Sequence, residues 1–211
     1  MPLIEKIANQ NGTIGVWELK ETSDDLLKSC HLNSVDKARL VTFKAEKRRK
    51  EFLATRLLLQ KLLPEREEVI YRDEFGKPSL MDSGLNISIT HSADLAAIIL
   101  SEKNIGIDIE QVQRNIDKVV TRFASPKEIE FIEKSNDPQL VKILLWSAKE
   151  AIFKCCGVQG VQFNRQIAIT PFDYNAQSNF SGVVQHPDKE AAYDLFFRMI
   201  KNNILVYCVQ H

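Results

Sequence analysis

The chain has 211 residues, of which 44% are hydrophobic and 27% are charged, a composition typical of a globular protein that buries a core. Its 28 lysines and arginines balance its 28 aspartates and glutamates, and this net charge of +0 excludes a polycationic nucleic-acid coat and an acidic disordered tail. The apolar run at 95–100 is far shorter than the ~20 residues that cross a bilayer, and residues 1–12 lack the pattern of a signal peptide. We therefore expect a cytoplasmic protein with no membrane partner and no nucleic-acid partner.

The cysteines do not form a metal-binding or disulfide pattern. Cys30, Cys155, Cys156 and Cys208 include no CxxC pair and no spacing typical of zinc ligands. Cys155 and Cys156 are adjacent in a helical pattern, where we expect small buried hydrophobic side chains. The cysteines are thus consistent with a protein that works in a reducing compartment.

Hydrophobic periodicity and turn residues predict a mixture of strands and helices along the whole chain. In the first half, predicted strands span 14–19, 69–72, 86–90 and 95–100, and predicted helices span 34–41, capped by Ser34, and 45–63, ended by Pro64. In the second half, predicted strands span 105–110, 167–171, 180–184, 191–199 and 204–209, and predicted helices span 116–124, 126–134, capped by Ser125, and 138–156, closed by Gly157. The order lacks a regular βαβ alternation, so we expect an α+β fold with a boundary near residue 103.

Two carboxylates stand close together in the pentapeptide that runs from Gly106 to Glu110. Side chains alternate across a strand, so Asp108 and Glu110 project from one face while Ile107 and Ile109 pack on the other. Neighbouring carboxylates repel each other unless a cation or a base lies between them, and Mg²⁺ is a natural partner. An ordinary solvated strand face with two acids is the alternative interpretation.

A third carboxylate lies on the last long predicted helix. Trp146, Glu150 and Lys154 are spaced by four residues and therefore share one face. An ordinary Glu–Lys pair beside a buried tryptophan would explain the spacing. Combined with Asp108 and Glu110, however, the same face could hold Mg²⁺ and bind a phosphate.

Groups suited to phosphate oxygens occur at the end of a predicted strand. Thr90, His91 and Ser92 are three consecutive hydrogen-bonding side chains, although a histidine at a turn can also be purely structural. From Lys37 to Lys61 there are nine lysines and arginines against two acids, Glu46 and Glu51. This stretch could bind nucleic acid, bind phosphate on a small molecule or form a solvated helix face, and no aromatic interleaving supports the first possibility. Lys77 adds a cation to the turn before Pro78.

Read in order, four segments resemble the 4′-phosphopantetheinyl transferases. They are Asp73-Glu-Phe-Gly-Lys-Pro78, Asn86-Ile-Ser-Ile-Thr-His-Ser92, Gly106-Ile-Asp-Ile-Glu110 and Trp146-Ser-Ala-Lys-Glu-Ala-Ile-Phe-Lys154. The chain length resembles the two-domain type that activates peptide synthetases. The resemblance implies two similar-sized α+β subdomains in a pseudo-twofold arrangement, with the active site in the cleft between them. Residues 1–103 would contact the nucleotide of coenzyme A, and residues 104–211 would supply the Mg²⁺ ligands and the carrier-docking surface.

The same resemblance implies roles for individual residues, position by position. Asp108, Glu110 and Glu150 match the Mg²⁺ ligands, and Lys154 matches a lysine near the reacting phosphate. The remaining matches are to coenzyme A contacts: Lys47, Arg48 and Arg56 near the 3′-phosphate, Lys77 and Pro78 in a loop at the nucleotide, and Thr90, His91 and Ser92 at a phosphate. Glu150 is the candidate general base, while Lys154 and His91 would stabilise phosphate oxygens.

The resemblance therefore implies a monomeric, Mg²⁺-dependent transferase of the holo-[acyl-carrier-protein] synthase class. It would move the phosphopantetheine arm of coenzyme A to a serine of an apo acyl or peptidyl carrier protein and release adenosine 3′,5′-bisphosphate. A non-catalytic coenzyme A- or carrier-binding module of the same fold is one alternative, and a nucleotide pyrophosphatase is another. We expect the acidic carrier to dock on Arg114, Lys118 and Arg122, which recur every four residues on a predicted helical face.

Overall fold

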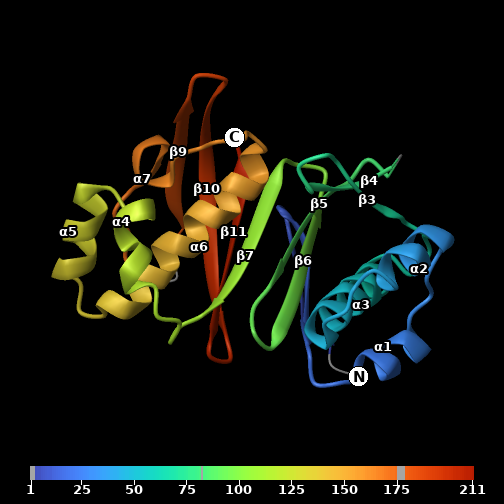
Figure 1. Ribbon diagram of the computed structural model, residues 1–211. Coiled ribbons are helices and arrows are strands. Elements are labelled where there is room, and N and C mark those ends of the chain that lie inside the picture. The colour runs from blue at the N-terminus through green and yellow to red at the C-terminus, as the bar shows by residue number, and fades with distance from the viewer. Residues whose placement is uncertain (1–2, 82, 175–178) are drawn as a thin grey trace. The chain divides into compact units, whose positions relative to one another are not determined.

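The computed structural model describes residues 3–81, 83–174 and 179–211. The chain divides into two compact units, Met1–Glu102 and Lys103–His211, and Figure 1 shows their elements. Each unit contains an antiparallel sheet and one long helix, so the predicted α+β class is confirmed. In the described part of the chain, no helix combines the length and the apolar character that crossing a bilayer requires.

The first unit is built on a four-stranded antiparallel sheet with the order β1-β2-β6-β5. Its strands are β1 (Leu3–Asn9), β2 (Gly12–Glu18), β5 (Asn86–His91) and β6 (Leu95–Ser101). Its helices are α1 (Ser23–Ser29), α2 (Ser34–Leu40) and α3 (Glu46–Leu62), and a separate hairpin is formed by β3 (Ile70–Arg72) and β4 (Pro78–Leu80).

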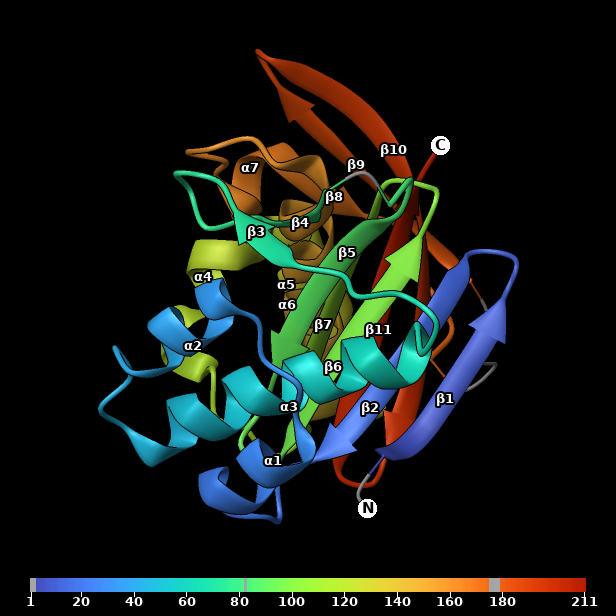
Figure 2. The ribbon, with the colours of Figure 1, turned by 90° about the vertical axis from the view of Figure 1, so that its right-hand side faces the viewer.

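Helix α3 covers one face of this sheet, as Figure 2 shows. Leu53 and Leu58 of α3 are fully buried in a core with Ile98 of β6. Gly15 of β2 allows a close approach, because a Cβ atom there would lie 3.0 Å from a methyl carbon of Leu58. Packing against the sheet thus fixes the orientation of α3 and of the polar side chains at its N-terminal end.

The second unit is built on a five-stranded antiparallel sheet with the order β7-β11-β10-β9-β8. Its strands are β7 (Ile105–Gln111), β8 (Ile167–Ile169), β9 (Phe180–His186), β10 (Lys189–Ile200) and β11 (Asn203–Gln210). The helical segments are η1 (Asp117–Val119), α4 (Val120–Phe123), α5 (Pro126–Lys134), α6 (Pro138–Cys156) and α7 (Phe163–Gln166).

The long helix α6 lies directly on β7 and β11. A Cβ atom on Gly106 would lie 1.9 Å from the carbonyl oxygen of Ala151, so only glycine fits where β7 passes under the helix. Gly157 then ends α6 with a φ of 68°, a left-handed conformation that glycine adopts without strain. The close packing of β7 against α6 therefore explains why the segment that carries Asp108 and Glu110 begins with a glycine.

The structure corrects two details of the predicted elements. Asn33, not Ser34, caps α2, because its side chain accepts a hydrogen bond from the backbone N–H of Asp36. The helix predicted at 116–124 is split into the single 3₁₀ turn η1 and the short α4, which leaves Arg114 in the turn before them. Ser125 does cap α5, in a reciprocal capping box with Glu128.

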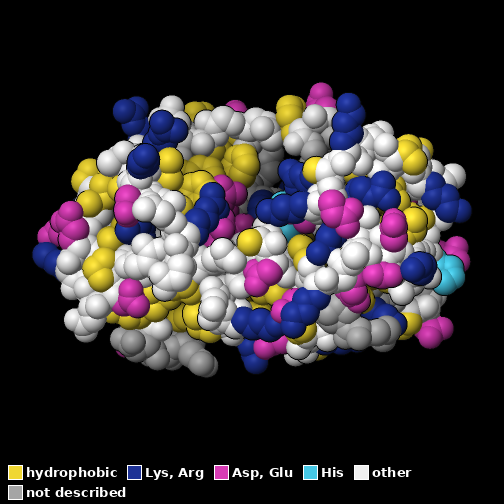
Figure 3. Space-filling view, turned by 60° about the horizontal axis from the view of Figure 1, so that its bottom comes forward, with side chains coloured by type: hydrophobic (Ala, Val, Ile, Leu, Met, Phe, Trp, Pro, Cys, Tyr) yellow, Lys and Arg dark blue, Asp and Glu magenta, His cyan; other side chains and the backbone are white. Residues whose placement is uncertain are grey.

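The surface carries both signs of charge. On the face drawn in Figure 3, lysine and arginine side chains are interspersed with aspartate and glutamate side chains, as the net charge of +0 leads one to expect. Any excess of one sign of charge is therefore confined to individual pockets and clusters of side chains.

Candidate functional site

Three carboxylates meet in the second unit, two from β7 and one from α6. Asp108 and Glu110 follow Gly106 along β7, and their side chains face the helix that lies on the strand. Glu150 projects from α6, and both strand carboxylates are close enough to raise its pKa. The structure thus brings together the three acids that the sequence singled out.

The two strand carboxylates each have cationic partners from the same unit. The ammonium group of Lys154 donates to Asp108 Oδ1 (2.7 Å) and to the carbonyl oxygen of Ile107 (3.0 Å). Glu110 is paired with Arg114, and its Oε1 also accepts a hydrogen bond from the indole N–H of Trp146 (3.1 Å). Lys154 and Glu110, two of the predicted site residues, are therefore held by groups of the chain itself.

Glu150 is in a different electrostatic situation. In the described part of the chain its carboxylate has no hydrogen bond and no ion pair. Burial is the main cause that raises its pKa to about 7, followed by repulsion from Asp108, while the charge of Lys154 acts in the opposite direction. Burial and Asp108 also raise the pKa of Glu110, against the effect of Arg114. A carboxyl group that titrates near neutral pH can accept a proton at physiological pH.

The predicted Mg²⁺ site is not arranged as a finished cage. Within residues 3–81, 83–174 and 179–211, no three His, Cys, Asp or Glu side chains are grouped as metal ligands. The chemistry of the donors nevertheless fits a hard cation, because carboxylate oxygens are the ligands that Mg²⁺ prefers and Asp108 raises the pKa of both Glu110 and Glu150. Asp108, Glu110 and Glu150 are the residues that would hold it.

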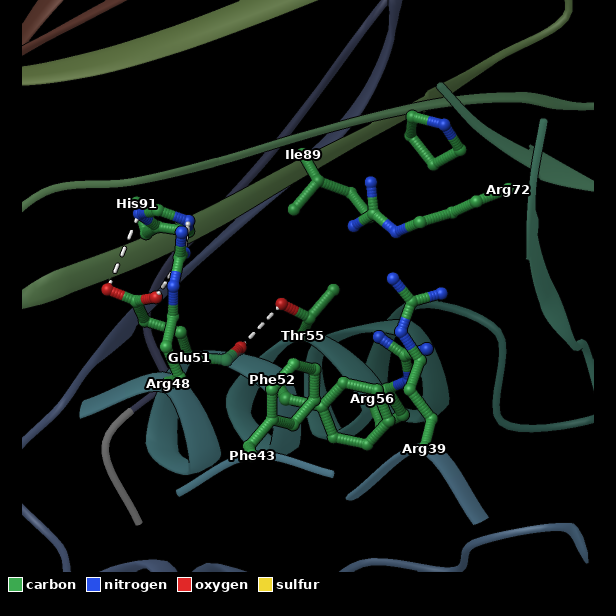
Figure 4. A pocket seen from close by; sticks show the side chains of 11 residues that line it. Arg39, Phe43, Arg48, Glu51, Phe52, Thr55, Arg56, Arg72, Ile89 and His91 are labelled. Carbon is green, nitrogen blue, oxygen red and sulfur yellow. Dashed lines mark hydrogen bonds and ion pairs between the residues drawn. The ribbon is translucent and has the colours of Figure 1, made fainter. Parts of the chain in front are cut away.

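The first unit contains a pocket of about 400 Å³ that gathers cationic side chains. Four arginines line it, and Figure 4 shows them with the surrounding side chains. They come from α2, α3 and β3, and the pocket is completed by Phe43, Glu51, Phe52, Thr55, Pro78, Ile89 and His91. The arginines are Arg39, Arg48, Arg56 and Arg72. We refer to this site as the arginine pocket.

Two of the four guanidinium groups are neutralised by carboxylates. Arg56 is buried and donates from Nε (3.0 Å) and Nη2 (2.7 Å) to the buried Asp36, while its guanidinium lies 3.8 Å from the ring centre of Phe52. Arg48 donates to Glu51 at 2.8 Å. Neither Asp36 nor Glu51 is exposed to solvent, so both pairs are fixed parts of the pocket wall.

The other two guanidinium groups, those of Arg39 and Arg72, have no carboxylate partner in the described structure. Arg72 donates to the carbonyl oxygen of Gly76, and in Figure 4 its guanidinium and that of Arg39 point toward one another. Burial, then the charges of Arg39, Arg56 and Arg48, lower the pKa of Arg72. A pocket that gathers like charges in this way is chemically suited to an anion such as a phosphate.

The remaining predicted residues are distributed unevenly around this pocket. Arg48, Arg56, Pro78 and His91 line it, whereas Lys47 and Lys77 are exposed and do not. Lys47 lies 3.8 Å from Glu51 at the surface of α3.

Thr90 and Ser92 are buried and do not line the arginine pocket. Side chains alternate along β5, so the hydroxyl group of Thr90 faces away from the side on which His91 contacts α3, while Ser92 follows the end of the strand. Of the three consecutive residues, His91 is therefore the one that lines the arginine pocket.

Sequence reasoning missed several contributors to these sites. Arg39 was only one of nine cations in a basic stretch, and Arg72 ended an unremarkable short strand, so neither carried a signal of its own. Arg114 was assigned to carrier docking, but it pairs with Glu110 and lies over the ring of Trp146, at 5.7 Å from its centre. A spacing of four indicates pairing only along a helix, and Glu110 lies on a strand, so no local pattern indicates this contact.

Lys149, next to Glu150, has a structural task. Its ammonium group is completely buried and donates to Glu128 (2.7 Å) and to the carbonyl oxygens of Phe123 (2.8 Å) and Ile167 (2.7 Å). It therefore connects α6 to α4, α5 and β8.

Comparison with known proteins finds a family match within the second unit. Residues 104–197 match the sequence profile of a family described as the 4′-phosphopantetheinyl transferase superfamily. The chain is 29% identical over 110 residues to the 4′-phosphopantetheinyl transferase gsp of Aneurinibacillus migulanus, covering 51% of this chain and 46% of that protein. It is 35% identical over 89 residues to a 4′-phosphopantetheinyl transferase of Bacillus subtilis, covering 40% and 39% of the two chains.

A third relative is the 4′-phosphopantetheinyl transferase AcpT of Salmonella typhimurium. It is 31% identical over 114 residues, which are 51% of this chain and 58% of that protein. The chain thus spans about half of the length of these curated relatives. The matched profile contains both strand carboxylates and the α6 carboxylate.

Proposed function

The chain belongs to the 4′-phosphopantetheinyl transferase superfamily through its second unit, and on that premise we propose that it transfers phosphopantetheine from coenzyme A to a carrier protein. The acceptor is a serine hydroxyl of an apo acyl or peptidyl carrier, and the second product is adenosine 3′,5′-bisphosphate. One observation carries this proposal. Glu150, inside the matched segment, is a carboxyl group with a pKa of about 7 beside two further carboxylates.

In the proposed reaction the serine oxygen attacks the phosphorus that bears the pantetheine arm. A new P–O bond forms to the serine, and the pyrophosphate P–O bond to adenosine 3′,5′-bisphosphate breaks. Glu150 takes the serine proton, directly or through a water molecule. Lys154, which pairs with Asp108, holds positive charge beside the reacting phosphate oxygens.

Mg²⁺ bound by Asp108, Glu110 and Glu150 would supply charge neutralisation to the pyrophosphate. The donor residues support this assignment in two ways: all three are carboxylates, and they repel one another. Trp146 and Arg114 orient Glu110 by contacting the same carboxylate.

We assign the 3′-phosphate of coenzyme A to the arginine pocket of the first unit. Arg39 and Arg72 support this assignment because they are the two guanidinium groups there without a carboxylate partner in the described structure. Arg39→Ala should weaken the binding of coenzyme A but hardly change the binding of 3′-dephospho-coenzyme A. Lys61→Ala is the matched control, since it removes one positive charge from an exposed position of α3 outside the pocket. Equal losses for both donors in Arg39→Ala would reject the assignment.

The decisive test of the overall reaction uses coenzyme A, Mg²⁺ and an apo carrier protein, with the mass of the carrier as the readout. A gain of one phosphopantetheine group supports the transferase. Release of free phosphopantetheine without a carrier would indicate a pyrophosphatase. Binding of coenzyme A with no change in either molecule would indicate a non-catalytic module.

A further inference from the structure

A single buried carboxylate organises one end of the arginine pocket. Glu51 of α3 is 4% exposed, and its Oε2 accepts a hydrogen bond from Arg48 Nη1 at 2.8 Å. Its Oε1 lies 3.5 Å from Nδ1 of His91 on β5 and 3.8 Å from the ammonium group of Lys47. Figure 4 shows the carboxylate, the imidazole and the Arg48 guanidinium facing one another.

These contacts determine the protonation pattern of the imidazole. Arg48 Nη1 lies 3.1 Å from Nε2 of His91. A guanidinium group can only donate, so Nε2 must carry the lone pair that accepts this hydrogen bond. The proton of the neutral ring is then on Nδ1, directed at Glu51. Glu51 thus accepts a hydrogen bond from the guanidinium and lies 3.5 Å from the opposite nitrogen of the imidazole that the guanidinium contacts.

We propose that Glu51 is a positioning residue for phosphate binding, which holds Arg48 and His91 in the places from which they contact a phosphate monoester. The inference rests on the proposed function, since the phosphate in question is the 3′-phosphate of coenzyme A. The side chain of Arg48 is 60% exposed and shares its pocket with three other guanidinium groups. Without Glu51, solvation of the guanidinium group and repulsion from the other three arginines would both favour movement of the Arg48 side chain out of the pocket.

Simple electrostatics predicts the opposite effect for this residue, and that difference makes the inference testable. A carboxylate in an anion-binding pocket repels the anion, so its neutralisation should strengthen binding if charge alone mattered. Positioning predicts weaker binding, because Arg48 and His91 then lose their fixed geometry. The sign of the change in affinity therefore distinguishes the two roles.

The experiment is calorimetric titration of wild-type protein and Glu51→Gln with adenosine 3′,5′-bisphosphate and with adenosine 5′-monophosphate. We expect Glu51→Gln to bind the bisphosphate ~10-fold more weakly, the equivalent of one lost charge-assisted hydrogen bond, with little change for the monophosphate. Glu65→Gln is the matched control, because Glu65 is exposed, lies outside the pocket and undergoes the same change of charge. Unchanged or tighter binding of the bisphosphate by Glu51→Gln would overturn the inference.

Nitrogen-15 NMR of the histidine side chains gives a readout that a merely structural role would not affect. In the wild-type protein His91 should be the Nδ1–H tautomer, and Glu51→Gln should lose this preference while Glu51→Asp retains it. An Nε2–H tautomer in the wild-type protein would overturn the inference even if Glu51→Gln failed to fold. If the wild-type protein itself does not prefer the bisphosphate to the monophosphate, the assignment of the pocket fails and the inference fails with it. A wild-type preference that persists in Glu51→Gln rejects the inference alone.

Discussion

Replacing Glu150 by glutamine should remove activity and at the same time stabilise the protein at alkaline pH. The pKa of Glu150 is raised from 4.5 to about 7, mainly by burial and then by Asp108. The folded state therefore binds this proton more tightly than the unfolded state does. Between pH 4.5 and about 7 the unfolded chain loses the proton first, so stability falls as pH rises through this window and stays low above it.

The size of the effect follows from the displacement of the pKa. A change of about 2.5 in pKa corresponds to an upper limit of ~3 kcal/mol, and partial solvation of the carboxylate reduces it to ~1–3 kcal/mol. Glutamine has nearly the same shape and no charge to desolvate. Glu150→Gln should therefore raise the melting temperature at pH 8 by ~3–10 °C for a chain of this size and change it little near pH 4.5.

The assay is thermal unfolding followed by circular dichroism at pH 4.5 and pH 8 in the presence of a metal chelator. Glu133→Gln is the control, because Glu133 is exposed on α5 and undergoes the same loss of charge. Mass spectrometry of the carrier should show that Glu150→Gln transfers almost no phosphopantetheine. A melting temperature at pH 8 that is unchanged or lower would refute the electrostatic reasoning, and transfer within a few-fold of wild type would refute the role as a base.

Three further experiments test other parts of the argument. Asp108→Ala should lower transfer and its dependence on magnesium together, and an unchanged half-saturation point and maximal rate in a magnesium titration would make Asp108 an ordinary strand residue. The double reversal Lys118→Glu and Arg122→Glu should raise KM for the carrier, more strongly at low salt, while KM for coenzyme A stays constant; an unchanged carrier KM would place docking elsewhere. Gly106→Ala should cost ~3 kcal/mol or more in chemical denaturation, because the new methyl group meets backbone of α6 at 1.9 Å, whereas Gly182→Ala should cost less, because its nearest contacts are the movable methyl ends of two isoleucines and the nearest backbone atom, the carbonyl oxygen of Ala168, is 3.3 Å away.

Most of the fold could be predicted because its long elements carry strong local signals. The helix predicted at 138–156 is observed with the same limits, since a proline at its start and a glycine after its end act through backbone geometry alone. The strand β1 and the helix α1 were not predicted. At the edge of its sheet β1 pairs with β2, and its buried and exposed side chains hardly alternate. The helix α1 has seven residues, too few to show a clear helical period of hydrophobic residues. Short elements at an edge are decided by tertiary contacts that local patterns do not contain.

The two sites differ in how far sequence could predict them. Asp108, Glu110 and Glu150 follow from strand alternation, helical spacing and a recognisable motif. The four arginines of the arginine pocket come from α2, α3 and β3, which meet only in the folded unit. The run of positive charge in α3 therefore indicated a basic site, but not which residues line it. In particular, no local pattern places Arg72 beside Arg39. Ion pairing also determines which arginines remain available to bind an anion, and only the folded structure shows that Asp36 pairs with Arg56.

Both units follow the same electrostatic logic, in which most of the functional charges are neutralised by the chain and a few are not. In the second unit Lys154 neutralises Asp108 and Arg114 neutralises Glu110, while Glu150 has no ion-pair partner among the described residues. In the arginine pocket of the first unit, Arg48 and Arg56 are paired with carboxylates, and among the described residues Arg72 has no carboxylate partner. The pKa values of Glu150 and Arg72 are displaced in the directions that disfavour their charges, upward for the acid and downward for the base. Such groups gain most from a ligand of opposite charge or from a proton, and for this reason we assign the chemistry to the first and the anchoring of an anion to the second.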